Sequence, residues 1–129
     1  MRIEAYFQQV RGTLDACLLV QSSNVACDKR STHEGFIRGE VYFVDGSLLH
    51  LREFVDVENT LDRLTYVYQY MDSTQQLVFR YDNTGHHRKL NLPTYPHHTH
   101  EGSEDNVVAS PAPNLDAVLK EIEALVHLP

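Results

Sequence analysis

Hydrophobic positions near the start of the chain recur at steps of three and four residues. Between residues 3 and 18 these positions hold Ile3, Phe7, Val10, Leu14, Cys17 and Leu18. Such a stripe lies along one side of an α-helix, so we expect an amphipathic helix over residues 3–18. A similar stripe follows the capping residue Asn114 and predicts a closing helix that buries Leu115, Val118, Leu119, Ile122, Leu125 and Val126.

Between these two helices the pattern changes to alternation, which is the period of a β-strand. Residues 25–30 predict a short first strand, and residues 36–55 predict a hairpin around Asp45-Gly46-Ser47. The loop length of this hairpin decides which side chains share a face. A three-residue loop is preferred because it makes one face nearly apolar. Glu53 is then the exception on a face with Ile37, Gly39, Val41, Phe43, Leu49, Leu51 and Val55.

A second hairpin, with strands at residues 64–71 and 76–82, carries three alternating tyrosines on one side: Tyr66, Tyr68 and Tyr70. Cross-strand packing is favoured for this tyrosine ladder over a platform for base stacking. Residues 83–113 are rich in proline and predict one long loop. The order of elements predicts a single α+β domain over residues 1–129. We expect one antiparallel sheet of four to five strands, with both helices packed on one face.

Composition narrows the classes of function. The chain has 129 residues and a net charge of −7, which disfavours broad, non-specific coating of nucleic acid. Only two cysteines are present, Cys17 and Cys27, and both have apolar neighbours, as is typical of a reduced cytoplasmic protein. The longest apolar run, residues 16–20, is too short to span a bilayer, so no membrane partner is expected.

The most informative segment is residues 86–100, which hold five of the eight histidines. Histidine both gives and takes a proton near neutral pH, and it is the commonest metal ligand. The start of this segment belongs to a basic group in an otherwise acidic chain. The group consists of Arg80, His86, His87, Arg88 and Lys89. A small anion-binding site fits this distribution better than a long basic groove does. A polar surface loop that is merely rich in histidine is the alternative.

One chemistry that uses these residue types is phosphodiester cleavage without a metal. The reaction needs a base for the 2′-hydroxyl, an acid for the leaving oxygen and a cation for the phosphorane. A pair of imidazoles together with Arg80 would supply all three. Asp82 or Glu53 would orient one imidazole by holding a ring nitrogen. Residue types support this hypothesis, although no spacing rule defines such a site.

The rival chemistry is metal binding. His98 and His100 are two residues apart, so in an extended segment their imidazoles point the same way. Adding His86 or Asp82 would give three ligands and an open position for zinc or manganese. The chain has no His-Glu-x-x-His and no paired Cys-x-x-Cys motif, so acid–base chemistry without a cofactor is preferred.

The alternation also predicts how the charged groups are arranged. A carboxylate among apolar side chains needs a partner, and we expect Glu53 to pair with Arg80 on the neighbouring hairpin. Exposure of Glu53 at the strand end is the alternative. We further expect His98 and His100 to face the same cleft as Arg80, with His97 turned away or in a supporting position.

Two motifs resemble the TumE family of small type II toxin–antitoxin toxins. The first is Leu77-Val78-Phe79-Arg80-Tyr81-Asp82-Asn83 followed by His86-His87, and the second is Pro96-His97-His98 followed by His100. Asp45-Gly46-Ser47-Leu48, the tyrosine ladder and the closing helix match as well, so that the likeness covers residues 20–126. The chain departs from the family pattern at Thr84-Gly85, where a proline is common.

The resemblance implies a toxin that is neutralised by a small helix-turn-helix antitoxin, and it leaves the chemistry and homodimer formation open. Together with the residues, it leads us to expect a metal-independent endoribonuclease that binds RNA. The candidate catalytic residues are Glu53, Arg80, Asp82, His86, His87, His98 and His100. The candidate substrate-binding residues are Tyr81, Asn83, Arg88, Tyr95 and His97. The alternative is a non-enzymatic interaction module whose His-rich loop binds a metal ion or a protein partner.

Overall fold

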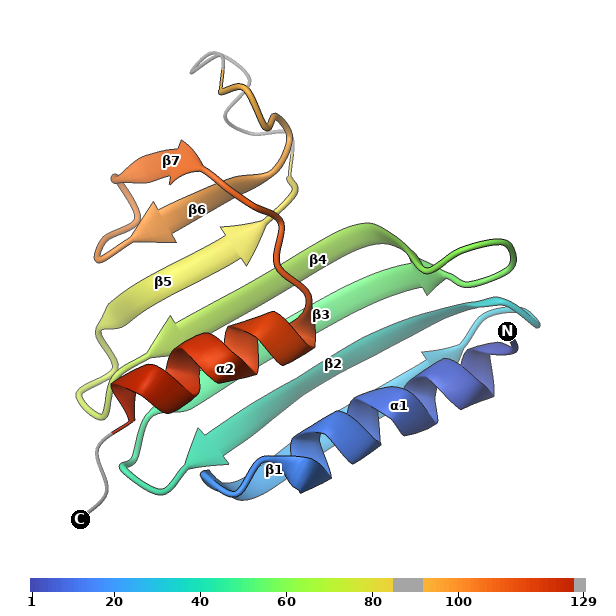
Figure 1. Cartoon of the computed structure of the whole chain (residues 1–129), viewed down its shortest axis with the longest axis horizontal. Coiled ribbons are helices and arrows are strands. Elements are labelled where there is room, and N and C mark those ends of the chain that lie inside the picture. Colours follow the sequence, from blue (N-terminus) through green and yellow to red (C-terminus); the bar gives the residue numbers. More distant parts are fainter. Residues whose placement is uncertain (85–91, 127–129) are drawn as a thin grey trace.

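The computed structural model describes residues 1–84 and 92–126. The described chain runs α1 (Ile3–Ala16), β1 (Val20–Lys29), β2 (Glu34–Phe43), β3 (Leu48–Asp56), β4 (Asp62–Met71), β5 (Leu77–Asp82), β6 (His98–Glu101), β7 (Val107–Ala109) and α2 (Leu115–Leu125). The strands form one antiparallel sheet in chain order, in which each strand pairs with the next. Both helices lie on the same face of this sheet (Figure 1). The α+β class and the one-sided packing of the helices are therefore confirmed.

The expected number of strands was wrong, because the sheet has seven strands rather than four to five. The additional strands β6 and β7 lie inside the segment predicted as a loop. They contain four and three residues, and β6 reads His-Thr-His-Glu, so neither strand shows an alternation of apolar and polar residues long enough to recognise. Strand β1 also starts earlier than predicted, at Val20. The sequence pattern does not indicate this start because most side chains of the strand are polar and exposed.

The register of the first hairpin agrees with the preferred loop length. Ile37 lies opposite Glu53 and Val41 lies opposite Leu49, so the nearly apolar face forms as predicted. The turn uses a positive φ of 85° at Gly46, a conformation that glycine adopts without strain. Gly39 faces β1 at close range, and an added Cβ would lie 2.6 Å from the Asn24 carbonyl oxygen.

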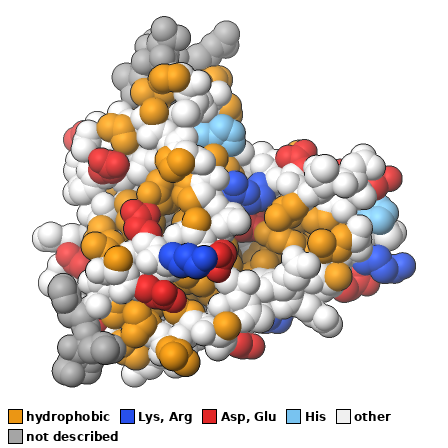
Figure 2. Space-filling view, in the orientation of Figure 1, with side chains coloured by type: hydrophobic (Ala, Val, Ile, Leu, Met, Phe, Trp, Pro, Cys, Tyr) orange, Lys and Arg blue, Asp and Glu red, His pale blue; other side chains and the backbone are white. Residues whose placement is uncertain are grey.

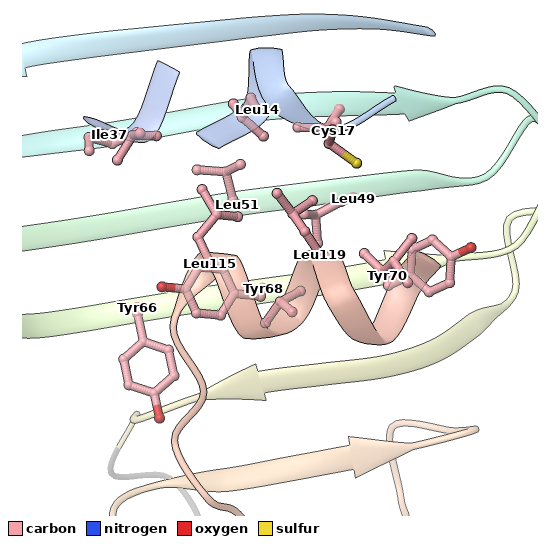
Figure 3. Close-up of a cluster of buried hydrophobic side chains, with 14 of the residues drawn as sticks. Leu14, Cys17, Ile37, Leu49, Leu51, Tyr66, Tyr68, Tyr70, Leu115 and Leu119 are labelled. Carbon is pink, nitrogen blue, oxygen red and sulfur yellow. The ribbon is translucent and has the colours of Figure 1, made fainter. Parts of the chain in front are cut away.

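The core lies between this face of the sheet and the two helices. Figure 3 shows Leu14 of α1 and Leu119 of α2 pointing at the sheet, with Leu49, Leu51 and Tyr68 directed towards them. Each of these side chains is at most 3% exposed. Burying one such leucine contributes roughly 1.5–3 kcal/mol, so the helices are held mainly by apolar contact. The tyrosine ladder faces this core, which confirms packing as its role.

On the helix-bearing face, hydrophobic side chains emerge between charged side chains of both signs (Figure 2). The opposite face of the sheet, here called the open face, carries the alternate residues of each strand. Two rows cross it in register, and they include Arg38, Arg52, Val67, Asp82 and His98 in one row and Glu40, His50, Gln69, Arg80 and His100 in the other. On β1 to β4 these residues are largely exposed or half-buried.

Two further expectations can be compared with the structure. Cys17 and Cys27 are both free thiols, as predicted. Among the described residues, neither helix is long and apolar enough to cross a membrane.

Candidate active site at strands β5 and β6

The pairing of β5 with β6 brings charged and histidine residues of the two sequence motifs onto one surface. Arg80 lies opposite His100, and Asp82 lies opposite His98. Because side chains alternate along a strand, all four side chains lie on the open face. Three of them are almost completely buried, with 1% of Asp82, 1% of His98 and 2% of His100 exposed. We call these four residues the Asp–His cluster.

Asp82 is the centre of this cluster. Its Oδ1 atom accepts hydrogen bonds from the backbone N–H and the hydroxyl of Thr84, at 3.0 and 2.9 Å. The Nε2 atom of His98 lies 2.9 Å from the same oxygen. On the other side, Nε of Arg80 donates to Oδ2 at 3.2 Å. The negative charge of Asp82 is thus balanced by a guanidinium and surrounded by donors, as a buried carboxylate requires.

The hydrogen bonds around the imidazoles determine which ring nitrogens carry hydrogen. Nδ1 of His100 lies 2.8 Å from the carbonyl oxygen of Glu104, and Nδ1 of His98 lies 3.0 Å from that of Pro96. A carbonyl oxygen only accepts, so both Nδ1 atoms donate. Nε2 of His100 lies 3.2 Å from Nη2 of Arg80. A guanidinium only donates, so in this contact Nε2 of His100 is the acceptor.

Arg80 connects the buried cluster with the surface. Its side chain is 26% exposed, and its Nη1 atom donates to Oε1 of Glu104 at 2.9 Å and to Oε1 of Gln69 at 3.4 Å. The Glu104 side chain is 56% exposed, so solvent reaches one side of the guanidinium. A pocket of about 510 Å³ lies beside it, lined by His50, Arg52, Val67, Gln69, Arg80, Asp82 and Thr84.

The same atoms form a candidate metal site. One ligand atom each from Asp82, His98 and His100 lies within 4.8 Å of the others. Hydrogen bonds from Nδ1 to backbone carbonyls are also how metal-binding histidines are usually oriented. Arg80, however, contacts both the carboxylate of Asp82 and Nε2 of His100, so a cation at this position would have to displace the guanidinium. In the structure these groups and Arg80 form a hydrogen-bonded cluster.

The predicted pair of Glu53 with Arg80 is wrong. Glu53 is buried as expected, with 2% exposed, but it lies on the helix-bearing face, whereas Arg80 lies on the open face. Its carboxylate accepts hydrogen bonds from the hydroxyl groups of Tyr6 and Tyr68, the latter at 2.5 Å. Arg63 in turn donates to the Tyr68 hydroxyl at 3.2 Å. Glu53 is therefore outside the Asp–His cluster and belongs to a structural network.

Burial is the main cause of the raised pKa values of Tyr6, Tyr66 and Tyr68. It raises the pKa values of Tyr6 and Tyr68 well above their usual range, and the charge of Glu53 adds to the effect. Burial also raises the pKa of Tyr66 to about 12. All three phenols therefore stay protonated over the physiological range, and they act as hydrogen-bond donors rather than as bases.

The predicted substrate-binding residues are dispersed. The hydroxyl of Tyr81 donates to Glu121 of α2 at 2.7 Å, and His97 turns away from the cluster towards the Tyr66 hydroxyl, 2.8 Å from its Nδ1. Asn83 accepts from the Tyr66 backbone N–H and donates to a backbone carbonyl of β4, which ties the end of β5 to β4.

The remaining predicted residues divide into two groups. Tyr95 is 43% exposed, in the segment that precedes β6. His86, His87 and Arg88 lie outside the described residues. Sequence reasoning missed Thr84, Gln69 and Glu104. For Thr84 a signal existed, because aspartate often accepts hydrogen bonds from the residue two positions later.

The likeness of the chain to a known protein family extends over most of its length. A family model described as Toxin TumE matches residues 10–126, which is most of the chain. The chain belongs to the TumE toxin family. Searches of curated proteins and of solved structures found no match. All members of the Asp–His cluster lie inside the residues that match the TumE model, so the cluster is part of the TumE domain itself.

Proposed function

We propose that this TumE-family chain is a toxin that cleaves RNA by metal-independent acid–base chemistry. The observation that carries the proposal is the Asp–His cluster, in which two buried imidazoles contact a buried carboxylate and a half-buried arginine, and these last two groups line an open pocket. Such a reaction needs one general base, one general acid and one cation that stabilises the transition state.

His100 is suited to act as the general base. Its Nδ1 donates to the Glu104 carbonyl, and its Nε2 accepts from Arg80. When a phosphate replaces this nitrogen as the partner of Arg80, the nitrogen takes the proton of the 2′-hydroxyl. The 2′-oxygen then forms a bond to the adjacent phosphorus.

His98 is suited to act as the general acid. Both of its ring nitrogens face oxygen atoms, Nδ1 that of Pro96 and Nε2 that of Asp82, so a ring that carries both protons can donate to each of them. Its proton passes to the leaving 5′-oxygen as the phosphorus–oxygen bond breaks. The products are a 2′,3′-cyclic phosphate and a free 5′-hydroxyl, and the proton taken by His100 balances the one given by His98.

Arg80 supplies the cation for the negatively charged transition state. Its present partner at the surface, Glu104, is more than half exposed, so a substrate phosphate can replace that carboxylate on the guanidinium at little cost. Asp82 keeps Arg80 in place through Nε during this exchange. Its role is to position both Arg80 and His98.

Membership of a toxin family supports a second part of the proposal, a protein antitoxin that neutralises the chain. We propose a small helix-turn-helix protein encoded beside it. The test is induction of the chain in a bacterial host with and without the neighbouring reading frame. Growth arrest that the neighbour relieves supports the proposal, and arrest that persists in its presence contradicts it.

The ribonuclease activity is tested with purified protein, untagged and treated with excess EDTA, on a labelled single-stranded RNA. We expect cleavage by the wild type and a loss of at least about a hundredfold in rate for His98→Asn and Arg80→Gln, as removal of an acid–base or oxyanion partner usually causes. His33→Ala is the matched control, because His33 contacts the Met1 carbonyl far from the cluster.

Two outcomes would contradict this proposal. Cleavage at the wild-type rate by folded His98→Asn and Arg80→Gln proteins would remove both residues from the mechanism. Activity that is lost in EDTA and restored by zinc or manganese would replace acid–base chemistry by a metal site at Asp82, His98 and His100. Circular dichroism and thermal unfolding establish that each variant is folded.

A further inference from the structure

The open face carries two arginines that face each other across neighbouring strands. Arg38 of β2 and Arg52 of β3 are register partners, and both side chains are exposed. In the part of the chain that the structure describes, neither guanidinium takes part in a hydrogen bond or an ion pair. Like charges directly opposite each other destabilise a sheet. An anion bound between the two side chains would remove this repulsion.

Next to this pair, two phenylalanine rings lie on the same face. Phe36 and Phe54 are also register partners, and their rings stack at a centroid distance of 4.4 Å with an angle of 16° between planes. Phe36 is 39% exposed, and the guanidinium of Arg30 lies 4.8 Å from the centre of its ring. Phe54 covers one face of the Phe36 ring, and the Arg30 guanidinium, which pairs with Asp28 at 3.2 Å, lies over the other. Because the Arg30 side chain is 57% exposed, a base can take its place on the ring, next to phosphate contacts from Arg38 and Arg52.

This surface leads directly to the Asp–His cluster. A hollow of about 600 Å³ is lined by residues that include Arg30, Phe36, Arg38 and Arg52. It shares Arg52, Val67 and Thr84 with the pocket beside Arg80 and Asp82. Arg52, Val67 and Asp82 are successive register partners on β3, β4 and β5. Two strand spacings separate Arg52 from Asp82, a distance of about 10 Å that one chain of nucleotides bridges easily.

We infer that the open face from β2 to β5 binds single-stranded RNA, with a base stacked on Phe36 in place of the Arg30 guanidinium and phosphates held by Arg38 and Arg52. The inference rests on the proposed ribonuclease function and adds the preference for a single strand, the surface that binds it and the route to the cluster. A duplex is disfavoured because its bases are already stacked and cannot reach a flat ring. Two arginines also match the few phosphate contacts of a short single strand better than they match the many phosphate contacts of a duplex.

An acidic protein segment, such as part of an antitoxin, is the other occupant that the two arginines would attract. The aromatic pair favours RNA, because nucleobases stack on an exposed ring whereas carboxylates do not. The helix-bearing face shows charged side chains of both signs between hydrophobic ones (Figure 2). The unbalanced arginine pair with an adjacent aromatic platform is a feature of the open face.

Binding is measured by fluorescence anisotropy with a labelled 2′-O-methyl RNA of about 12 nucleotides, within the range that one small domain covers. The methyl group blocks the attacking oxygen, so wild-type protein binds the strand without cleaving it. We expect the double variant R38A/R52A to weaken binding at least about tenfold and to flatten the slope of log Kd against log salt by about 1.4, the value for two phosphate contacts. Arg2→Ala, which removes an exposed arginine at the start of α1, should change neither quantity.

The stacking contact is tested separately. Phe36→Leu keeps an apolar side chain without a flat ring and should weaken binding at least about fivefold, whereas Phe36→Tyr should retain wild-type affinity. A duplex of the same sequence should bind at least about tenfold more weakly than the single strand. Equal affinity of R38A/R52A and Arg2→Ala, or of the two Phe36 variants, would overturn the inference.

Failure of this inference can be told apart from failure of the proposed activity. Binding of the 2′-O-methyl strand does not require His98 or His100 to act. If this strand binds as described and unmodified RNA stays intact, the surface is correct and the ribonuclease is not. If unmodified RNA is cleaved with the same KM by wild type and R38A/R52A, the ribonuclease is correct and the surface is not. Loss of antitoxin binding in R38A/R52A with RNA binding unchanged assigns the face to the antitoxin and overturns the inference.

Discussion

The buried network around Glu53 allows a prediction whose size follows from the structure. In Tyr68→Phe the carboxylate loses a donor at 2.5 Å while it stays buried, and Arg63 loses an acceptor at 3.2 Å. A hydrogen bond to a charged group contributes about 1.5–3 kcal/mol, and a buried charge left with fewer partners costs its desolvation as well. We therefore expect Tyr68→Phe to lower the free energy of unfolding by about 2–3 kcal/mol.

The assay is equilibrium unfolding in urea, followed by circular dichroism. Tyr42→Phe is the matched control, because Tyr42 also donates to a glutamate, Glu40, at 2.8 Å, but on the exposed surface. Solvent replaces that hydrogen bond, so this substitution should be nearly silent. The midpoint of Tyr68→Phe should fall while the denaturant slope stays that of the wild type.

Equal midpoints for Tyr68→Phe and Tyr42→Phe would refute this reasoning. They would show that Glu53 reaches water in solution, so that neither α1 nor the tyrosine ladder depends on its carboxylate. A drop in the midpoint with a changed denaturant slope would point instead to an altered denatured state, and the Tyr6→Phe variant would then be needed to separate the two effects.

Three further predictions concern pH, helix capping and metals. The pKa values of Tyr6 and Tyr68 in the folded protein are raised above 10.0, so the unfolded chain releases these protons first as the pH rises past 10. The free energy of unfolding should therefore fall there by up to about 1.4 kcal/mol per pH unit for each tyrosine. Urea titrations at pH 9 and pH 11 check this, and an unchanged midpoint contradicts it. The side chain of Asn114 accepts from the Ala117 backbone N–H at 2.9 Å, so Asn114→Ala should cost about 1 kcal/mol in the same assay, and no loss would show that the cap is dispensable. Arg80→Ala should let zinc bind at Asp82, His98 and His100 more tightly than the wild type does, because the competing guanidinium is gone; calorimetric titration measures this, and stronger binding by the wild type would contradict the competition.

Much of this fold could be predicted from the pattern of the chain. The two apolar stripes predict α1 and α2, and the loop around Gly46 fixes the register that buries Glu53. The short strands β6 and β7 could not be predicted, because His-Thr-His-Glu carries no apolar alternation and its partner strand has three residues. Strand β6 is held by pairing with β5, and β7 by pairing with β6, which is a tertiary effect.

The partner of Glu53 illustrates a second limit. The alternation on β3 placed Glu53 on the apolar face, but the sequence does not show which face of the second hairpin continues that face. The structure places Tyr66 and Tyr68 there and turns Arg80 to the other side. Tyr6, the second donor, comes from a helix distant in sequence, and no local pattern indicates such a contact.

The candidate site was predictable only in part. The spacing of His98 and His100 placed both imidazoles on one side, and their pairing with Asp82 and Arg80 required β6 to exist as a strand. The hydrogen bonds from Thr84 and the backbone contacts of the imidazoles depend on side-chain geometry that the sequence does not specify.

The central claim is that the Asp–His cluster uses the 2′-hydroxyl of RNA as the attacking group without a metal. The most direct test compares two labelled strands of the same sequence in excess EDTA, one of ribonucleotides and one of deoxyribonucleotides, with analysis of the product ends. The account predicts cleavage of the RNA alone, with 2′,3′-cyclic phosphate ends, and no detectable cleavage of either strand by His100→Asn. Cleavage of the DNA strand, or RNA products that carry 5′-phosphate ends, would contradict it.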